Sequence, residues 1–125
     1  MANIYTIASG NASSTSVWNG GVVPVSGDRV LISAGHTVTL DGTYTWGDDT
    51  TSTISINGVS TTAGVTIRGT LTHPRAANSN LILRGGMNVD AGGEHNMGVQ
   101  GDPIQDGYTA ELTLNFSSAP SVGKY

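Results

Sequence analysis

Short runs in which apolar and polar residues alternate recur along most of this chain. In the run 36–40, for example, Val38 and Leu40 share one face, and Thr37 and Thr39 take the other. Because successive side chains of a β-strand point to opposite faces, each run predicts a short strand with one buried face. The predicted strands cover residues 3–8, 29–33, 36–40, 53–56, 65–67, 70–72, 80–83, 87–89 and 111–114, with a further short strand around 44–46. The pattern indicates an all-β fold.

The apolar pairs of three predicted strands recur at similar spacings. Ile54/Ile56, Leu81/Leu83 and Leu112/Leu114 lie 27 and then 31 positions apart (81 minus 54 and 112 minus 81). Such spacings are typical of stacked repeats, in which each repeat covers the apolar face of the one before. They favour a single domain over residues 1–125, built as a short right-handed β-helix-like coil or as a β-sandwich. An antiparallel jelly-roll sandwich is the alternative, because it also consists of regularly spaced strands and turns.

Composition narrows the class of protein. A length of 125 residues suits one domain, and 18 glycines with a single lysine and two glutamates disfavour helices. The absence of cysteine excludes disulfides and thiolate metal sites, so core packing and backbone hydrogen bonds must hold the fold. A net charge of −4 and scattered arginines argue against nucleic-acid binding, and no apolar run is long enough to span a membrane.

Glycine and proline punctuate the chain in a pattern that a known family shares. The segment 18–42 joins Gly-Gly, a proline and Ser-Gly-Asp to two strand-like runs, and it resembles the opening of the G-eight domain. This glycine-rich β-module occurs in large extracellular receptors and hyaluronan-handling proteins. The segments 55–58 and 67–71 resemble its "strand, glycine, strand" repeats, 95–104 its closing segment and 110–115 its last strand. The resemblance covers about residues 18–115, brings no catalytic motif, and leaves 116–125 as a C-terminal arm or linker.

The histidines and the acidic turn residues lack the spacing of metal ligands. His36, His73 and His95 are far apart and form no His-x-His or His-x-x-x-His pair. The turn carboxylates that could gather around calcium are Asp28, Asp41, Asp48 and Asp49. They do not follow the pattern of a calcium loop, and aspartates in β-turns commonly bond to nearby backbone. No metal site and no cofactor are therefore expected.

Enzymatic chemistry also lacks a sequence signature. The carboxylates clustered closely enough for glycoside hydrolysis are Asp90, Glu94, Asp102 and Asp106. They lie in glycine-rich turns, which are commonly the corners of a coil, and no Gly-x-Ser-x-Gly elbow is present. We therefore expect no catalytic residue and a protein that is not an enzyme.

Aromatic side chains offer one candidate binding surface. Tyr44 and Trp46 share a strand face beside an acidic turn, whereas Trp18 belongs to the G-eight-like opening and is expected in the core. Aromatic rings can stack on sugars. Tyr44 and Trp46 are therefore the candidate glycan-binding residues, against the alternative that the two rings cap the end of the core.

A part of a phage virion is the function that these features favour. The opening Met-Ala-Asn-Ile-Tyr and the run Trp-x-Gly-Gly-x-x-Pro-x-x-Gly-Asp resemble phage structural proteins with G-eight-like domains. A start without a visible secretion signal is expected of a protein made in the host cytoplasm and assembled into virions. The hypothesis is a non-enzymatic tail-fibre, tail-tip or capsid-surface component that forms an oligomer with itself or with other virion proteins. The alternative is a carbohydrate-binding module that recognises a host cell-surface glycan.

Overall fold

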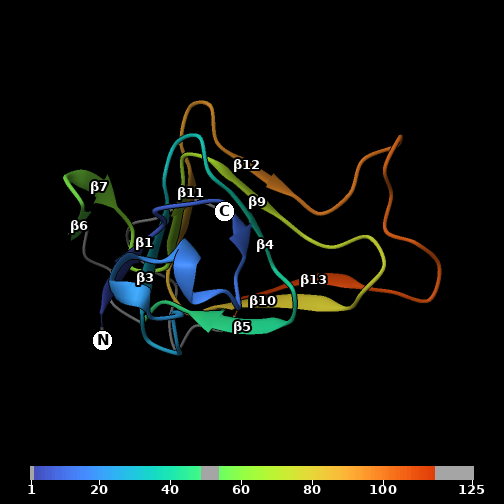
Figure 1. Ribbon diagram of the computed structural model, residues 1–125, viewed down its shortest axis with the longest axis horizontal. Helices are drawn as coiled ribbons and strands as arrows, with labels where there is room; N and C mark the ends of the chain where they lie inside the picture. Colours follow the sequence, from blue (N-terminus) through green and yellow to red (C-terminus); the bar gives the residue numbers. More distant parts are fainter. Residues whose placement is uncertain (1, 49–53, 115–125) are drawn as a thin grey trace.

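The chain winds as a stack of four coils through three β-sheets. The computed structural model describes residues 2–48 and 54–114 (Figure 1). Coil 1 contains β1 (Asn3–Tyr5) and β2 (Gly10–Asn11), followed by the 3₁₀ turns η1 (Thr15–Val17) and η2 (Asn19–Gly21). The later strands are β3 (Arg29–Ile32), β4 (Thr37–Thr39) and β5 (Thr43–Trp46) in coil 2, β8 (Val65–Ile67), β9 (Thr70–Thr72) and β10 (Ser79–Leu83) in coil 3, and β11 (Met87–Val89), β12 (Glu94–Asn96) and β13 (Ala110–Leu114) in coil 4.

Each sheet takes one strand from successive coils. The strands β1, β3, β8 and β11 form the first sheet, β2, β4, β9 and β12 the second, and β5, β10 and β13 the third. All neighbours within these sheets are parallel. Parallel pairing of successive coils is the topology of a β-helix, so the all-β prediction and its coil interpretation are confirmed. The jelly-roll alternative is wrong, because a jelly roll has antiparallel sheets and the three sheets here are parallel.

A hairpin interrupts the stack between coil 2 and coil 3. Its strands, β6 (Ile54–Ile56) and β7 (Val59–Thr61), pair antiparallel across Asn57 and Gly58, which both have positive φ. An Asn-Gly turn of this kind closes a local hairpin. The prediction that 54–56 stacks on 81–83 is therefore wrong, and Tyr44 and Trp46 occupy that position instead. The 31-residue repeat from Leu81 to Leu112 is confirmed by the pairing of β10 with β13.

The core consists of inward-facing columns that run along the stack. In the first sheet, Ile4, Val30, Val65 and Met87 lie in one column, and all four are buried. In the second sheet, Val38 and Leu71 are buried, and the next residue of their column is His95. Since parallel strands in register place equivalent side chains over one another, each coil covers the apolar residues of its neighbour. His95 therefore occupies a position that is apolar in the coils before it.

Glycines at one corner allow neighbouring coils to approach closely. A β-carbon on Gly69 would overlap the carbonyl oxygen of His36, and one on Gly93 would overlap that of Ile67. The amide of Glu94 donates to the carbonyl of Gly69 at 2.9 Å, so the two corners are joined directly by the backbone. Part of the high glycine content is thus a requirement of coil stacking.

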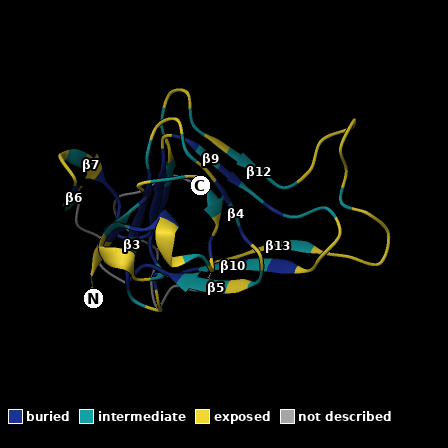
Figure 2. Cartoon of the chain, viewed as in Figure 1, coloured by how far each residue is buried: buried dark blue, intermediate teal, exposed yellow. Residues whose placement is uncertain are grey.

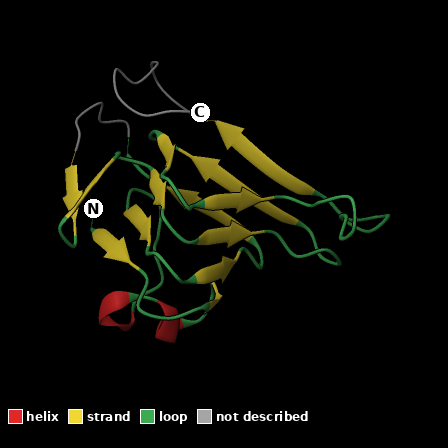
Figure 3. Cartoon of the chain, turned by 90° about the horizontal axis from the view of Figure 1, so that it is seen from above, coloured by secondary structure: helices red, strands yellow, loops and turns green. Residues whose placement is uncertain are grey.

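A tryptophan closes the stack at coil 1. Residues 2–28 contribute no strand to the third sheet, and Trp18 packs there against Trp46, with ring centroids 5.8 Å apart in an edge-to-face arrangement. Its Nε1 donates to the carbonyl oxygen of Ala12 at 2.9 Å, and both residues are buried. The side chain of Asn19 accepts the amide N–H of Tyr5 at 2.8 Å. Figure 3 shows the two 3₁₀ turns at this end of the stack.

Within residues 2–48 and 54–114, coil 4 forms the opposite end, and no strand lies on its outer side. Among the described residues, β11, β12 and β13 are the last strands of their sheets. Val89, Leu112 and Leu114 continue inward columns but are 44%, 36% and 49% exposed. We call these three side chains the terminal face. Figure 2 shows buried residues inside the stack, whereas β13 is exposed along most of its length.

Candidate functional site

A pair of histidines links coil 3 to coil 4. His73 directly follows β9, and His95 lies in β12. Their Nε2 atoms are 2.9 Å apart, and Nδ1 of His73 is 2.6 Å from Oγ of Ser79 at the start of β10. His73 is 1% exposed, while His95 is half-buried. The three side chains form one hydrogen-bonded row that connects the second and third sheets.

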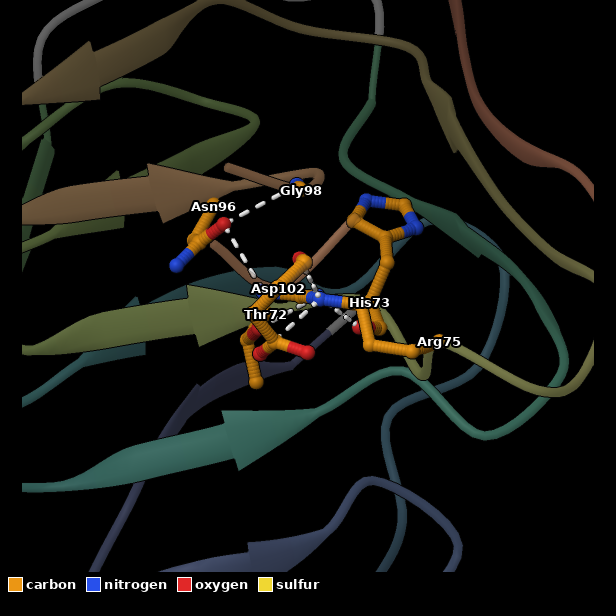
Figure 4. Close-up of polar contacts among 6 residues, drawn as sticks. All are labelled: Thr72, His73, Arg75, Asn96, Gly98 and Asp102. Carbon is orange, nitrogen blue, oxygen red and sulfur yellow. Dashed lines mark hydrogen bonds and ion pairs between the residues drawn. The ribbon is translucent and has the colours of Figure 1, made fainter. Parts of the chain in front are cut away.

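Arg75 holds the long loop between β12 and β13 at the same corner (Figure 4). Its Nε donates to the carbonyl oxygen of Asp102 at 2.8 Å and lies 3.2 Å from Oδ2 of that residue. Nη2 donates at 3.1 Å to Oδ1 of Asn96, which also accepts the amide N–H of Gly98. Nη1 donates to the carbonyl oxygen of His73. A single guanidinium thus connects coil 3, β12 and the loop through charge-assisted hydrogen bonds.

The surroundings of the histidine pair favour the neutral imidazoles. Burial, with contributions from the nearby His95 and Arg75, lowers the pKa of His73 to about 4. Burial also lowers the pKa of His95. A neutral imidazole has one donor and one acceptor nitrogen, so at neutral pH one Nε2 donates its proton to the other. The pair is therefore a hydrogen bond that depends on protonation state.

The row does not offer an accessible nucleophile. Ser79 and His73 lie within the distance expected of a nucleophile and its base. Both residues are buried, so a substrate has no access to the hydroxyl of Ser79 in this conformation. The geometry supports a structural role for the row.

The predicted aromatic pair does not form an exposed platform. Trp46 is fully buried, so its expected exposure is wrong, because the inward column of the third sheet runs from Leu83 to Trp46. Tyr44 is half-buried, and its hydroxyl donates to Oδ1 of Asp41 at 2.7 Å. Burial and this carboxylate raise the pKa of Tyr44. The two rings help to cap the core, and Trp18 lies in the core as predicted.

The turn carboxylates make separate local contacts. Asp28 accepts hydrogen bonds from two backbone N–H groups at 2.9 Å. Asp41 accepts from the hydroxyls of Ser13 and Tyr44. Asp48 lies 3.5 Å from Arg29. Asp49 lies outside the described residues. Within residues 2–48 and 54–114, no group of three or more histidine and carboxylate side chains could hold a metal ion.

The carboxylates considered for glycoside hydrolysis are also held individually. Asp90 lies 3.6 Å from Nε of Arg68 and accepts a hydrogen bond from Asn88 at 2.9 Å. Asp102 pairs with Arg75, while Glu94 and Asp106 are exposed. The two carboxylates that have partners are thus engaged with different arginines at different corners.

The sequence spacing of the histidines does not reveal the His73–His95 pair. The spacing of two corner glycines nevertheless indicates which coil positions lie side by side. The register of β9 and β12 sets an interval of 24 residues, from Leu71 to His95 (95 minus 71), and the corner residues Gly69 and Gly93 share it. Aligning the two glycines places His95 at a core position and so brings it near His73. The third histidine, His36, lies elsewhere and bonds to Oγ1 of Thr6 at 2.8 Å.

In the part of the chain that the structure describes, these features define a short parallel β-helix whose first coil carries a buried tryptophan and whose last coil exposes apolar side chains. The sequence model of the G8 domain matches residues 17–122, and the chain therefore belongs to the G8 domain family. This agrees with the resemblance found over residues 18–115. No curated protein and no solved structure matches the chain. In the described ranges, no helix has the length and apolar character needed to cross a membrane.

Proposed function

We propose that this G8 domain is a non-enzymatic structural component of a phage particle, located in the tail fibre, at the tail tip or on the capsid surface. In this role it is a β-rich block, made in the host cytoplasm, that joins a neighbouring subunit in the virion. The neighbour is a second copy or another virion protein. No cofactor takes part.

The terminal face is the observation that carries this proposal. Leu112 and Leu114 are apolar, partly exposed and aligned with buried residues of coil 3. Edge strands can pair with other chains through their free N–H and C=O groups, and terminal repeats of solenoids that face water usually carry polar caps. An apolar end fits a joint between subunits better than it fits contact with water.

Two further features support a place in a particle. The chain has no cysteine, so its stability does not depend on the redox state of its surroundings. Its opening segment resembles those of phage structural proteins with G-eight-like domains, and the chain belongs to that domain family. Both features suit a protein that is made inside a cell and works outside it.

The proposal is tested by the copy number of the chain in particles and by its mass in solution. Mass spectrometry of purified phage particles should recover the chain at a fixed copy number, and light scattering should give an oligomer. Leu112→Ser with Leu114→Ser should reduce the solution mass to that of a monomer. A matched control replaces Val22 and Val25, which are 55% and 64% exposed outside the terminal face, with serine and should leave the oligomer intact.

A monomer that is absent from particles would contradict the proposal and turn attention to the carbohydrate-binding alternative. That alternative now rests on Tyr44, because Trp46 is buried. Binding to a glycan array that is lost in Tyr44→Ala would favour it. The same loss in Val25→Ser would point to a nonspecific effect.

A further inference from the structure

The His73–His95 pair lies where the inward column of the second sheet is apolar in the two coils before it. His95 continues the column of Val38 and Leu71, and His73 lies two residues beyond Leu71, next to Leu40 of the coil before. The amide of Leu40 donates to Thr72, the residue before His73. Burying a polar ring at such a position is unfavourable unless its nitrogens are hydrogen-bonded. Among the described residues, the partner histidine and Ser79 supply these bonds for His73.

The contact between the rings tolerates only some protonation states. In the neutral pair, one Nε2–H donates a hydrogen bond to the other Nε2, 2.9 Å away. A first added proton can enter at Nδ1 of the half-buried His95 and leave this bond in place. When both rings are charged, both Nε2 atoms carry protons and neither can accept. Two N–H groups and two positive charges then face one another.

The charged groups around the pair do not offset the repulsion between two charged imidazoles. Arg75 is positive and lies beside His73, and its nearest carboxylate, Asp102, is already paired with it at 3.2 Å. The other titratable groups on the adjoining elements include Glu94 on β12, Asp106 and Tyr108 in the loop, Glu111 on β13 and His36 before β4. The three carboxylates are exposed, and Glu94 points to the opposite side of β12 from His95 because side chains alternate along a strand.

Several backbone bonds between coil 3 and coil 4 lie beside the pair. The amide of His73 donates to the carbonyl oxygen of Asn96 at 3.0 Å. The amide of Gln105 donates to the carbonyl oxygen of Arg75 at 2.8 Å. These bonds join β9 to β12 and to the β12–β13 loop. Separation of the two rings would therefore disturb the attachment of both elements.

We propose that the His73–His95 pair is an acid-sensitive clasp that fastens β12 and the β12–β13 loop to coil 3 and releases them when both imidazoles are protonated. The clasp goes beyond the proposed structural role, because it makes the attachment of coil 4, which carries the terminal face, dependent on pH. It holds whether or not the protein is part of a particle.

Proton linkage gives the direction in which pH changes the stability of the closed clasp, and the pH range over which it does so. The closed form lowers the pKa of His73 from 6.5 to about 4, so the opened form binds protons more readily. The closed form keeps its full stability above pH 6.5 and loses it as the pH falls from 6.5 towards 4. For His73 alone, the opening equilibrium should increase roughly 20-fold between pH 7 and pH 5.

Residue-resolved hydrogen exchange by NMR, corrected for intrinsic exchange rates, tests the clasp. Between pH 7 and pH 5, protection of the His73 and Gln105 amides should fall by roughly 20-fold in the full chain. The amide of Leu40, which joins coil 2 to coil 3, is the internal control and should keep its protection. In His95→Gln the fall should shrink to a few-fold, because the side chain can rotate so that its Oε1 accepts a hydrogen bond from Nε2–H of charged His73. His36→Gln removes a histidine outside the pair and should behave like the wild type.

Equal loss of protection at Leu40 would indicate general acid unfolding and overturn the clasp. A full 20-fold fall in His95→Gln would overturn it as well. If that variant does not fold, the imidazole protons of the wild type decide the question. Titration of His73 near pH 6.5 with unchanged exchange at Gln105 would contradict the proposal, and its titration near pH 4 or together with loop opening would support it.

Discussion

At coil 1 the stack ends on Trp18, a buried indole that packs edge-to-face on Trp46 and donates a hydrogen bond to the backbone of Ala12. At coil 4 it ends on Leu112 and Leu114, which are 36% and 49% exposed. Both ends belong to the same three-sheet coil, and an inward column of the third sheet runs from beneath Trp18 to coil 4. Leu114, Leu83 and Trp46 lie in a single column. The column is apolar at both ends. The two ends therefore differ in whether another side chain covers the last residue of the column.

This difference gives the stack a direction. A repeat protein is stabilised by contacts between neighbouring repeats, so each terminal repeat must either be covered or meet another surface. Trp18, in the segment 12–21 of coil 1, covers Trp46 at the end of the third sheet. The described residues contain no equivalent cover for coil 4, which instead carries the histidine clasp and the loop held by Arg75. One end is covered by a buried tryptophan, and the other exposes the apolar side chains for which we propose a partner.

Removing the tryptophan cover should have the largest effect on stability. Trp18→Ala takes away a fully buried indole and uncovers Trp46, and truncations of this kind cost about 3–5 kcal/mol of unfolding free energy. Urea unfolding measures the loss. Tyr108→Ala, at an exposed aromatic residue of coil 4, is the control and should cost less than about 0.5 kcal/mol. A cost below about 1 kcal/mol for Trp18→Ala would show that the third sheet does not need this cover.

Two leucines in one column separate the middle of the stack from its open end. Leu83→Ala creates a cavity at a fully buried site and should cost about 2–5 kcal/mol. Leu114→Ala, one coil further along, should cost less than about 1 kcal/mol in the monomer because the side chain is half exposed. Urea unfolding at low protein concentration compares the two. Equal costs would mean that the terminal face is covered in solution.

A glycine substitution should weaken coil 4 without disturbing the closed end. Gly93→Ala places a methyl group against the carbonyl oxygen of Ile67, and overpacking of this kind costs about 1–3 kcal/mol. Gly101→Ala is the matched control, because no atom lies within 4 Å of the added carbon and its φ is not positive. Hydrogen exchange should show loss of protection in β12, while the fluorescence of Trp18 and Trp46 stays native. A change of tryptophan fluorescence at the same denaturant concentration would show that the coils unfold as one unit.

Much of the fold could be predicted from local pattern. Alternation located most strands, and the 31-residue interval between Leu81 and Leu112 reflects a real stacking contact. The same reasoning failed at Ile54 and Ile56, because alternation is identical in a coil strand and in a hairpin strand. Only the Asn57-Gly58 turn distinguishes the two, since both residues adopt the positive φ that a tight hairpin requires.

The candidate site was much less predictable. Tyr44 and Trp46 were expected on the surface, but burial depends on what covers a strand, and Trp18 covers Trp46 from 28 positions away (46 minus 18). The contact between His73 and His95 likewise depends on the register of β9 and β12. Spacing rules for metal and catalytic sites consider residues on one element, so they do not detect a pair that is formed between coils.

The amino-acid sequence by itself determined the strand pattern, the absence of disulfides and the family, because alternation, composition and corner glycines are local properties of the chain. The tertiary structure decided which end is closed, which aromatic rings are buried and which histidines meet. These outcomes depend on the register between coils, and a shift of one residue in that register would turn every inward side chain outward.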